Sequence, residues 1–237
     1  MRSSPRRSTV SPEIRVEAQR LDIAVGKESV SGLLLRPPNA TALYLFAHGA
    51  GAGMTHQAME SNAQGLADRG IATLRYQFLY MENGSRRPDP PRLAHAVVRA
   101  AANEATRLAP DLPLYAGGRS FGGRMTSQAQ AETPLPNVRG LAFLGFPLHP
   151  AGKPGTERAE HLSRVNVPML FVSGDRDALA ETDLLKSAVL GLGERATLHL
   201  VPHADHSFKT AAKSGRTSRE AEAEALDAIV EWIARGH

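Results

Sequence analysis

A serine flanked by pairs of glycines is the residue of this sequence best placed to act as a nucleophile. Residues 117–123 are Gly-Gly-Arg-Ser-Phe-Gly-Gly, which places the pattern Gly-x-Ser-x-Gly around Ser120. An apolar run, 112–116, precedes it, and residues 124–132, without proline or glycine, predict a helix after it. In a strand, a sharp turn and a helix, this pattern holds a nucleophilic serine exposed above a sheet. The alternative is an ordinary serine in a glycine-rich loop, in a chain with 21 glycines.

A serine nucleophile needs a base and an acid, and both types follow later in the chain. Two short apolar runs, 167–172 and 197–201, predict buried parallel strands. The first is followed by a loop that contains Asp177, and the second by a loop that contains His206. The three side chains thus follow the ends of predicted strands, which meet at one edge of a parallel sheet. We expect His206 to take the Ser120 proton and Asp177 to orient the imidazole.

Each of these two partners has a neighbour of the same type. His203 is an alternative base, but it follows a proline at the strand end and has little slack to reach the serine. Asp175 is an alternative acid, but it directly follows a glycine and is well placed to cap the turn. We favour His206 and Asp177, and both alternatives stay open at this point.

A fourth element would stabilise negative charge on the substrate. The apolar run 42–47 predicts a buried strand, and residues 48–53, His-Gly-Ala-Gly-Ala-Gly, follow it. Small residues there let backbone N–H groups approach a developing oxyanion, each contributing roughly 3 kcal/mol. The N–H of Phe121, directly after the serine, is the expected first donor, and the N–H of Ala50 is the second. Gly51 is the less favoured alternative to Ala50.

The same glycine-rich loop could in principle bind a phosphate or a dinucleotide. The glycines at 49, 51 and 53 lack the spacing of a dinucleotide-binding turn, and the next strand, 71–75, ends without a ribose-binding acid. A phosphate-binding loop would need a Lys-Ser or Lys-Thr pair, which does not follow. The chain has no cysteine, which excludes disulfides and thiolate metal sites. We therefore expect no cofactor and no metal.

Composition favours one enzyme-sized domain rather than a nucleic-acid or membrane protein. The 237 residues are 42% hydrophobic, which is enough for one large core, and no apolar run reaches the length of a membrane span. The net charge is +4, with three arginines among the first seven residues, so the remainder is near neutral and nucleic-acid binding has little support. The start of the chain lacks the apolar segment of a signal peptide. We expect a disordered basic tail over residues 1–12, one domain over 13–237 and a cytoplasmic location.

Strand and helix patterns alternate along the rest of the chain. Residues 13–25 and 29–36 predict an entry hairpin, and helices are expected near 56–69, 92–108 and 218–234. The fold class expected is therefore α/β, with a mostly parallel central sheet and helices on both faces. Only residues 146–162 leave room for a cap, so we expect little or no cap domain.

Two arginines flank the serine and have two interpretations. Arg119 and Arg124 would, in the simpler one, bind carboxylates or carbonyls near the turn. In the other, one of them contacts an anionic substrate.

Six short segments carry a resemblance to a known family: 48–51, 75–81, 86–89, 117–125, 174–177 and 205–208. Together they resemble an α/β-hydrolase of the dienelactone-hydrolase-like type, over about residues 13–236. More narrowly, the chain is similar to a subgroup that includes relatives of a non-catalytic chromatin-complex subunit. The resemblance implies the α/β-hydrolase fold, with Ser120 as nucleophile, Asp177 as acid and His206 as base. Dienelactone hydrolases use a cysteine nucleophile, which this chain lacks, so that activity is not implied.

The function expected is a serine hydrolase that cleaves a small carboxylic ester or related acyl bond through an acyl-enzyme. One alternative is a non-catalytic binding or scaffold protein on the same fold, since a fold alone does not give a function. Another is a thioesterase or peptidase that uses the same residues. The expected partner is a small ester-like molecule, with no nucleic acid and no membrane, and the sequence indicates no oligomeric state.

Overall fold

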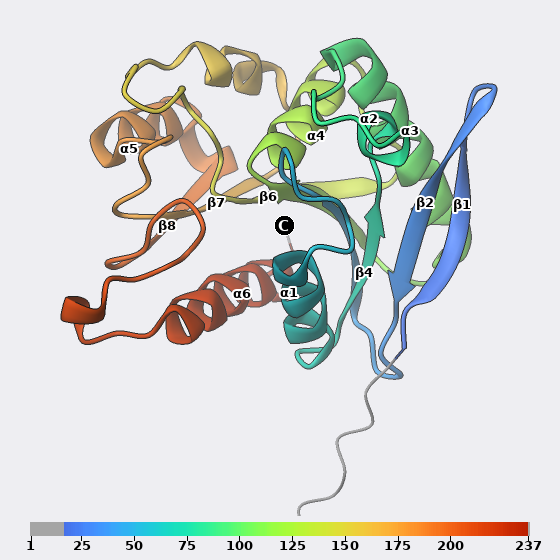
Figure 1. Ribbon diagram of the computed structural model, residues 1–237, viewed down its shortest axis with the longest axis horizontal. Helices are drawn as coiled ribbons and strands as arrows, with labels where there is room; N and C mark the ends of the chain where they lie inside the picture. Colours follow the sequence, from blue (N-terminus) through green and yellow to red (C-terminus); the bar gives the residue numbers. More distant parts are fainter. Residues whose placement is uncertain (1–16, 237) are drawn as a thin grey trace, which may run out of the picture.

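Eight short, largely apolar segments form the strands of one sheet in the computed structural model, which describes residues 17–236 (Figure 1). The strands lie in the order β1-β2-β4-β3-β5-β6-β7-β8. The first two strands are antiparallel to each other, β2 is antiparallel to β4, and all further neighbours are parallel. The strands are β1 (Gln19–Val25), β2 (Glu28–Leu35), β3 (Ala42–Ala47), β4 (Ile71–Tyr76), β5 (Leu114–Arg119), β6 (Val138–Leu144), β7 (Met169–Gly174) and β8 (Ala196–Val201).

Helices cover both faces of this sheet, and Figure 1 shows α1 and α6 on one side and α2, α3, α4 and α5 on the other. Two apolar clusters fill the corresponding spaces, one against α3, α4 and α5 and one against α1 and α6. The expected α/β class, a mostly parallel sheet with helices on both faces, is therefore confirmed. The helices are α1 (Gln57–Ala67), α2 (Leu79–Glu82), α3 (Pro91–Leu108), α4 (Phe121–Glu132), α5 (Thr182–Gly191) and α6 (Ser218–Ala234), with short 3₁₀ helices η1 (Glu157–Arg164), η2 (Gly193–Arg195) and η3 (Ala212–Ser214).

The periodic pattern of α3 shows how sequence and packing agree. Its fully buried face is made of small and β-branched residues, which lets the helix lie close to the sheet. Proline occupies its first turn, where a missing N–H costs nothing. The buried residues of this face are Ala94, Val97, Val98, Ala101, Ala102 and Ala105.

Two local features differ from the sequence-based expectation. Gly84 and the prolines at 88, 90 and 91 predict a loop over residues 77–91, but the short helix α2 lies within this segment. The helix after the serine begins at Phe121 rather than at 124. Between β6 and β7 only the 3₁₀ helix η1 covers the sheet edge, as expected for a fold with little or no cap. The predicted tail, residues 1–12, lies outside the described residues.

Among residues 17–236, no helix is both long and apolar enough to cross a membrane.

Gly122 gives a sharp test of how tightly α4 packs against the sheet. A Cβ at this position would lie 2.5 Å from the carbonyl oxygen of His48 and 2.7 Å from the Cβ of Ala47. Alanine normally stabilises a helix by about 1 kcal/mol relative to glycine, but overpacking costs about 1–3 kcal/mol. We therefore expect Gly122→Ala to lower the free energy of unfolding, measured by urea denaturation.

Gly191, the last residue of α5, provides the matched control. A Cβ there meets nothing within 4 Å, so Gly191→Ala should leave stability unchanged or raise it by up to about 1 kcal/mol. A Gly122→Ala protein as stable as the wild type would contradict the close contact of α4 with β3.

Candidate active site

Ser120 occupies the single residue at which the chain leaves β5 and enters α4. Its backbone has φ 47° and ψ −116°, a conformation that costs about 1–3 kcal/mol for a residue with a side chain. Two backbone hydrogen bonds hold it there, because Ser120 N donates to Leu144 O and Arg124 N donates to Ser120 O, both at 3.1 Å. The strained turn that the sequence pattern predicts is therefore present.

The structure brings the three predicted side chains into one hydrogen-bonded chain. His206 Nε2 lies 2.9 Å from Ser120 Oγ, and His206 Nδ1 lies 2.7 Å from Asp177 Oδ2. A carboxylate that accepts from Nδ1 keeps the proton on that nitrogen, so Nε2 is free to accept the serine hydroxyl proton. This arrangement has the geometry of a nucleophile, a base and an orienting acid.

The Asp177 carboxylate is buried and fixed by further donors. Its side chain is fully shielded from solvent. Oδ1 accepts from Leu179 N at 2.8 Å, and Ser173 Oγ donates to Oδ2 at 3.5 Å. A buried carboxylate with these donors holds the imidazole in one orientation. Gly145 leaves room for the ring, because a Cβ at this position would come within 3.3 Å of it.

The two alternative partners lie outside this chain of hydrogen bonds. Asp175 is exposed, and its backbone carbonyl accepts from Thr182 Oγ1. His203 is exposed in the turn after β8, with a positive φ of 64°. The geometry therefore favours Asp177 and His206.

Backbone N–H groups beside Ser120 are placed to bind an oxyanion. Phe121 is the first residue of α4, where an N–H has no partner within the helix. Ala50 lines the same cavity as Ser120 and Phe121. The N–H of Gly51 is already donated to Tyr80 Oη at 3.3 Å, which leaves Ala50 as the better second donor.

His48 fixes the orientation of the peptide that carries the Ala50 N–H. The ring is fully buried, and its Nε2 accepts from Phe78 N at 3.1 Å. Nδ1 must then carry the proton and donate to Gly49 O, 2.8 Å away. Because a trans peptide is planar, holding the Gly49 carbonyl on one side points the Ala50 N–H to the other.

Arg119 links the strand before the serine to the loop after the base. Its guanidinium donates to Asn62 Oδ1 at 2.7 Å and to Ser207 O at 3.4 Å, and it lies 5.6 Å from the centre of the Phe208 ring. Burial lowers the pKa of this guanidinium from its usual value. Arg119 thus contacts carbonyl oxygens, as the simpler of its two interpretations predicts, and positions the His206 loop.

A cavity of about 460 Å³ opens beside Ser120. Sequence reasoning anticipated Arg124 near it, but missed the residues that other loops contribute, because the segments after β4, β6 and β7 have no periodic pattern. The missed lining residues include Asp89, Pro147, Pro150, Arg158 and Leu179.

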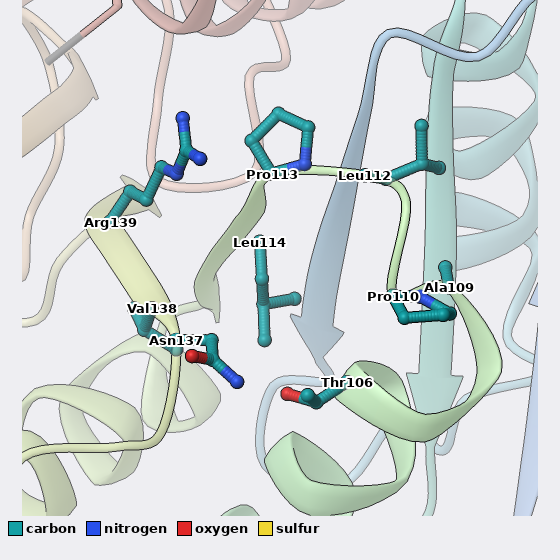
Figure 2. A pocket seen from close by; sticks show the side chains of 9 residues that line it. All are labelled: Thr106, Ala109, Pro110, Leu112, Pro113, Leu114, Asn137, Val138 and Arg139. Carbon is teal, nitrogen blue, oxygen red and sulfur yellow. The ribbon is translucent and has the colours of Figure 1, made fainter.

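A second hollow lies at the opposite edge of the sheet and lacks such chemistry. It has a volume of about 370 Å³ and is formed where β5 and β6 begin. Figure 2 shows Thr106, Leu114, Asn137 and Arg139 among the side chains that line it. No group of three histidine, aspartate or glutamate side chains able to hold a metal ion is found within the described part of the chain.

Two buried histidines make folding stability depend on pH. Burial lowers the pKa of His48 to about 4, and burial with nearby positive charges lowers that of His161 to about 4. In the unfolded chain both titrate near 6.5, so between about pH 6.5 and 4 the unfolded state binds more protons. Stability is therefore full above pH 6.5 and falls as the pH drops toward 4, by on the order of 3 kcal/mol for each group.

Replacing either ring should flatten this dependence. We expect His48→Asn and His161→Asn each to reduce the slope of unfolding free energy against pH between 6.5 and 4. The exposed His203→Asn serves as the control and should keep the wild-type slope. Equal slopes in all four proteins would show that neither buried ring is held neutral.

Comparison with known proteins gives one family match. The profile of a family described as "Alpha/beta hydrolase domain" matches residues 40–234, which is most of the chain. The match covers the glycine-rich loop after β3, the serine turn and both loops that carry the acid and the base.

Solved structures with the same fold come from several bacteria. A dienelactone hydrolase from Anabaena variabilis has a TM-score of 0.74 and 24% identity, over 93% of this chain and 98% of that chain. An alpha-beta serine hydrolase homologue from Coxiella burnetii has a TM-score of 0.71 and 18% identity, over 93% and 99%. A serine hydrolase without lid from Xanthomonas campestris has a TM-score of 0.70 and 19% identity, over 94% and 98%. At these identities the likeness establishes the fold.

Proposed function

Because this chain belongs to the alpha/beta hydrolase domain family, we propose that it is a serine hydrolase that cleaves a small carboxylic ester or related acyl bond. The observation that carries the proposal is the hydrogen-bonded chain from Ser120 through His206 to Asp177. A pure scaffold on this fold has no need for a strained serine turn and a buried acid. We further propose one domain over residues 13–237, a cytoplasmic location and no cofactor.

Attack on the substrate uses the hydroxyl of Ser120. His206 Nε2 takes the proton as Oγ bonds to the carbonyl carbon, and Asp177 stabilises the imidazolium that forms. Negative charge then develops on the former carbonyl oxygen. The N–H groups of Phe121 and Ala50 bind it, each contributing roughly 3 kcal/mol to the lowering of the barrier.

Collapse of this intermediate releases the alcohol. His206 returns its proton to the leaving oxygen, and the acyl group stays on Ser120 as an ester. A water molecule then enters, His206 takes one of its protons, and its oxygen attacks the acyl carbon. The second collapse returns the proton to Ser120 Oγ and releases the carboxylic acid. A thioester or amide would follow the same steps, and neither has a specific observation in its favour.

Covalent labelling tests the identity of the nucleophile. We expect a fluorophosphonate probe to label the wild-type protein, and Ser120→Ala to abolish labelling while ester turnover falls by a factor on the order of 10⁴ or more. Ser207→Ala is the matched control, since this exposed serine lies directly after His206 and should leave labelling intact. Persistent labelling of Ser120→Ala would contradict the assignment of Ser120 as the nucleophile.

Substitutions at Asp175 and Asp177 distinguish a loss of catalysis from a loss of loop structure. Asp177→Asn keeps the shape but offers Nδ1 the wrong partner, a change that costs about 10⁴ in turnover in another triad. Asp175→Asn should retain activity, because its carboxylate is exposed and lies outside the hydrogen-bonded chain. Turnover and melting temperature of both variants check this. If the folded Asp175→Asn protein is the inactive one, the acid is wrongly assigned.

A further inference from the structure

The lining of the cavity beside Ser120 includes charged side chains that ester hydrolysis does not require. Near the serine its walls are formed by Ala50 and Phe121. Two arginines, Arg124 and Arg158, and the carboxylate of Asp89 also line it. Ligand cavities of this size commonly hold small molecules through a few placed polar groups, so these charges are candidates for recognition.

Arg124 is a partly buried cation for which residues 17–236 provide no side-chain hydrogen bond or ion pair. It follows Ser120 by one turn of α4, which places its Cα about 6 Å along the helix axis from that of the serine. Its Nε is buried and has no hydrogen-bond partner among the described residues. Burial and the charge of Arg158 lower the pKa of this guanidinium from its usual value. A buried donor left unpaired is costly, so a ligand that accepts from it would bind favourably.

Arg158 adds a second positive charge from a different element. It lies near the start of η1, in the segment that crosses the sheet edge between β6 and β7. The ion pairs found within residues 17–236 involve neither Arg124 nor Arg158. The charge of Arg158 is close enough to lower the pKa of Arg124, so the two like charges repel each other, and a bound anion would reduce that repulsion.

Asp89 sets the charge that the cavity can accept. Its Oδ2 accepts from Tyr80 N at 3.0 Å, so part of this carboxylate is already engaged. With two positive side chains and one negative, the cavity carries one net positive charge. A singly charged carboxylate matches this balance, and its two oxygens suit the planar donors of an arginine.

The position of the base decides which part of the substrate enters the cavity. In the proposed reaction the leaving oxygen must face His206 Nε2, which gives it the proton. His206 is not among the described residues that line the cavity, whereas both oxyanion donors are. The leaving group therefore lies outside the cavity, and the acyl chain extends from the attacked carbon into it.

We propose that the acyl part of the substrate ends in a carboxylate, which Arg124 and Arg158 bind while Ser120 attacks the ester carbon. The substrate class is then a half-ester of a short dicarboxylic acid. This inference rests on the proposed serine hydrolase function and adds to it the chemistry of the acyl group.

Paired substrates test the proposal directly. The monomethyl ester of glutaric acid carries the carboxylate, and the methyl ester of glutaramic acid is its neutral isostere. We expect kcat/KM of the wild-type enzyme to favour the charged ester by about tenfold or more, as hydrogen bonds to charged groups do. Arg124→Gln and Arg158→Gln should each bring that ratio close to one. Arg139→Gln, at the far edge of the sheet, should keep the wild-type ratio.

The outcomes separate this inference from the proposed function. If the wild-type enzyme hydrolyses both esters equally, or prefers the neutral one, the inference is overturned and the serine hydrolase stands. If Arg139→Gln changes the ratio as much as the cavity variants do, the preference arises from overall charge, and the inference is again overturned.

A binding measurement covers the case in which neither ester is turned over. In the Ser120→Ala protein, monomethyl glutarate should raise the melting temperature more than the neutral amide does, and adding Arg124→Gln should remove the difference. Arg124→Lys guards against misfolding, because it keeps the charge and should retain part of the shift. No difference between the two compounds in Ser120→Ala would refute anion binding, whatever the activity of the protein.

Discussion

The site depends on the one-residue crossing from β5 into α4. For the chain to turn there, the first turn of α4 must pack against β3 and β5. The backbones then lie closer together than most side chains allow. A Cβ at Gly118 would lie 2.3 Å from Ala47 O, and one at Gly122 would lie 2.5 Å from His48 O. Glycines at these positions permit the approach, and the strain is concentrated at Ser120. Its hydroxyl consequently projects above the sheet, and the N–H of Phe121, which has no partner within α4, follows it directly.

Given that crossing, the remaining parts are held from neighbouring strands. The acid follows β7 and the base follows β8, and a buried carboxylate joins them across the sheet edge. Arg119, at the end of β5, binds the carbonyl of Ser207 and so ties the base to the strand of the nucleophile. His48, after β3, holds the peptide before Ala50. Each chemical group is therefore fixed by a second contact from a rigid element, which preorganises the site.

Much of this was predictable because the chemistry lies in short local patterns. The serine turn, the order of acid and base and the glycine-rich loop are each readable within a few residues, and the parallel sheet brings their ends together. Ala50 is the better second oxyanion donor because the N–H of Gly51 is donated to Tyr80. Tyr80 lies in the short helix α2, which the proline-rich sequence around it does not predict. Arg158 reaches the cavity because of the course of the chain between β6 and β7, where the sequence has no periodic hydrophobic pattern. Such contacts arise from tertiary packing and leave no local signal in the sequence.

The central claim is that Ser120 attacks a carbonyl whose oxygen lies between two backbone donors while its acyl chain occupies the charged cavity. A crystal structure of the protein after reaction with a phosphonate ester that carries a terminal carboxylate tests this most directly. The account predicts a bond from Ser120 Oγ to phosphorus, a phosphonyl oxygen within hydrogen-bond distance of the N–H groups of Phe121 and Ala50, and the carboxylate between Arg124 and Arg158. An adduct on another serine, or an oxygen directed away from both N–H groups, would contradict it.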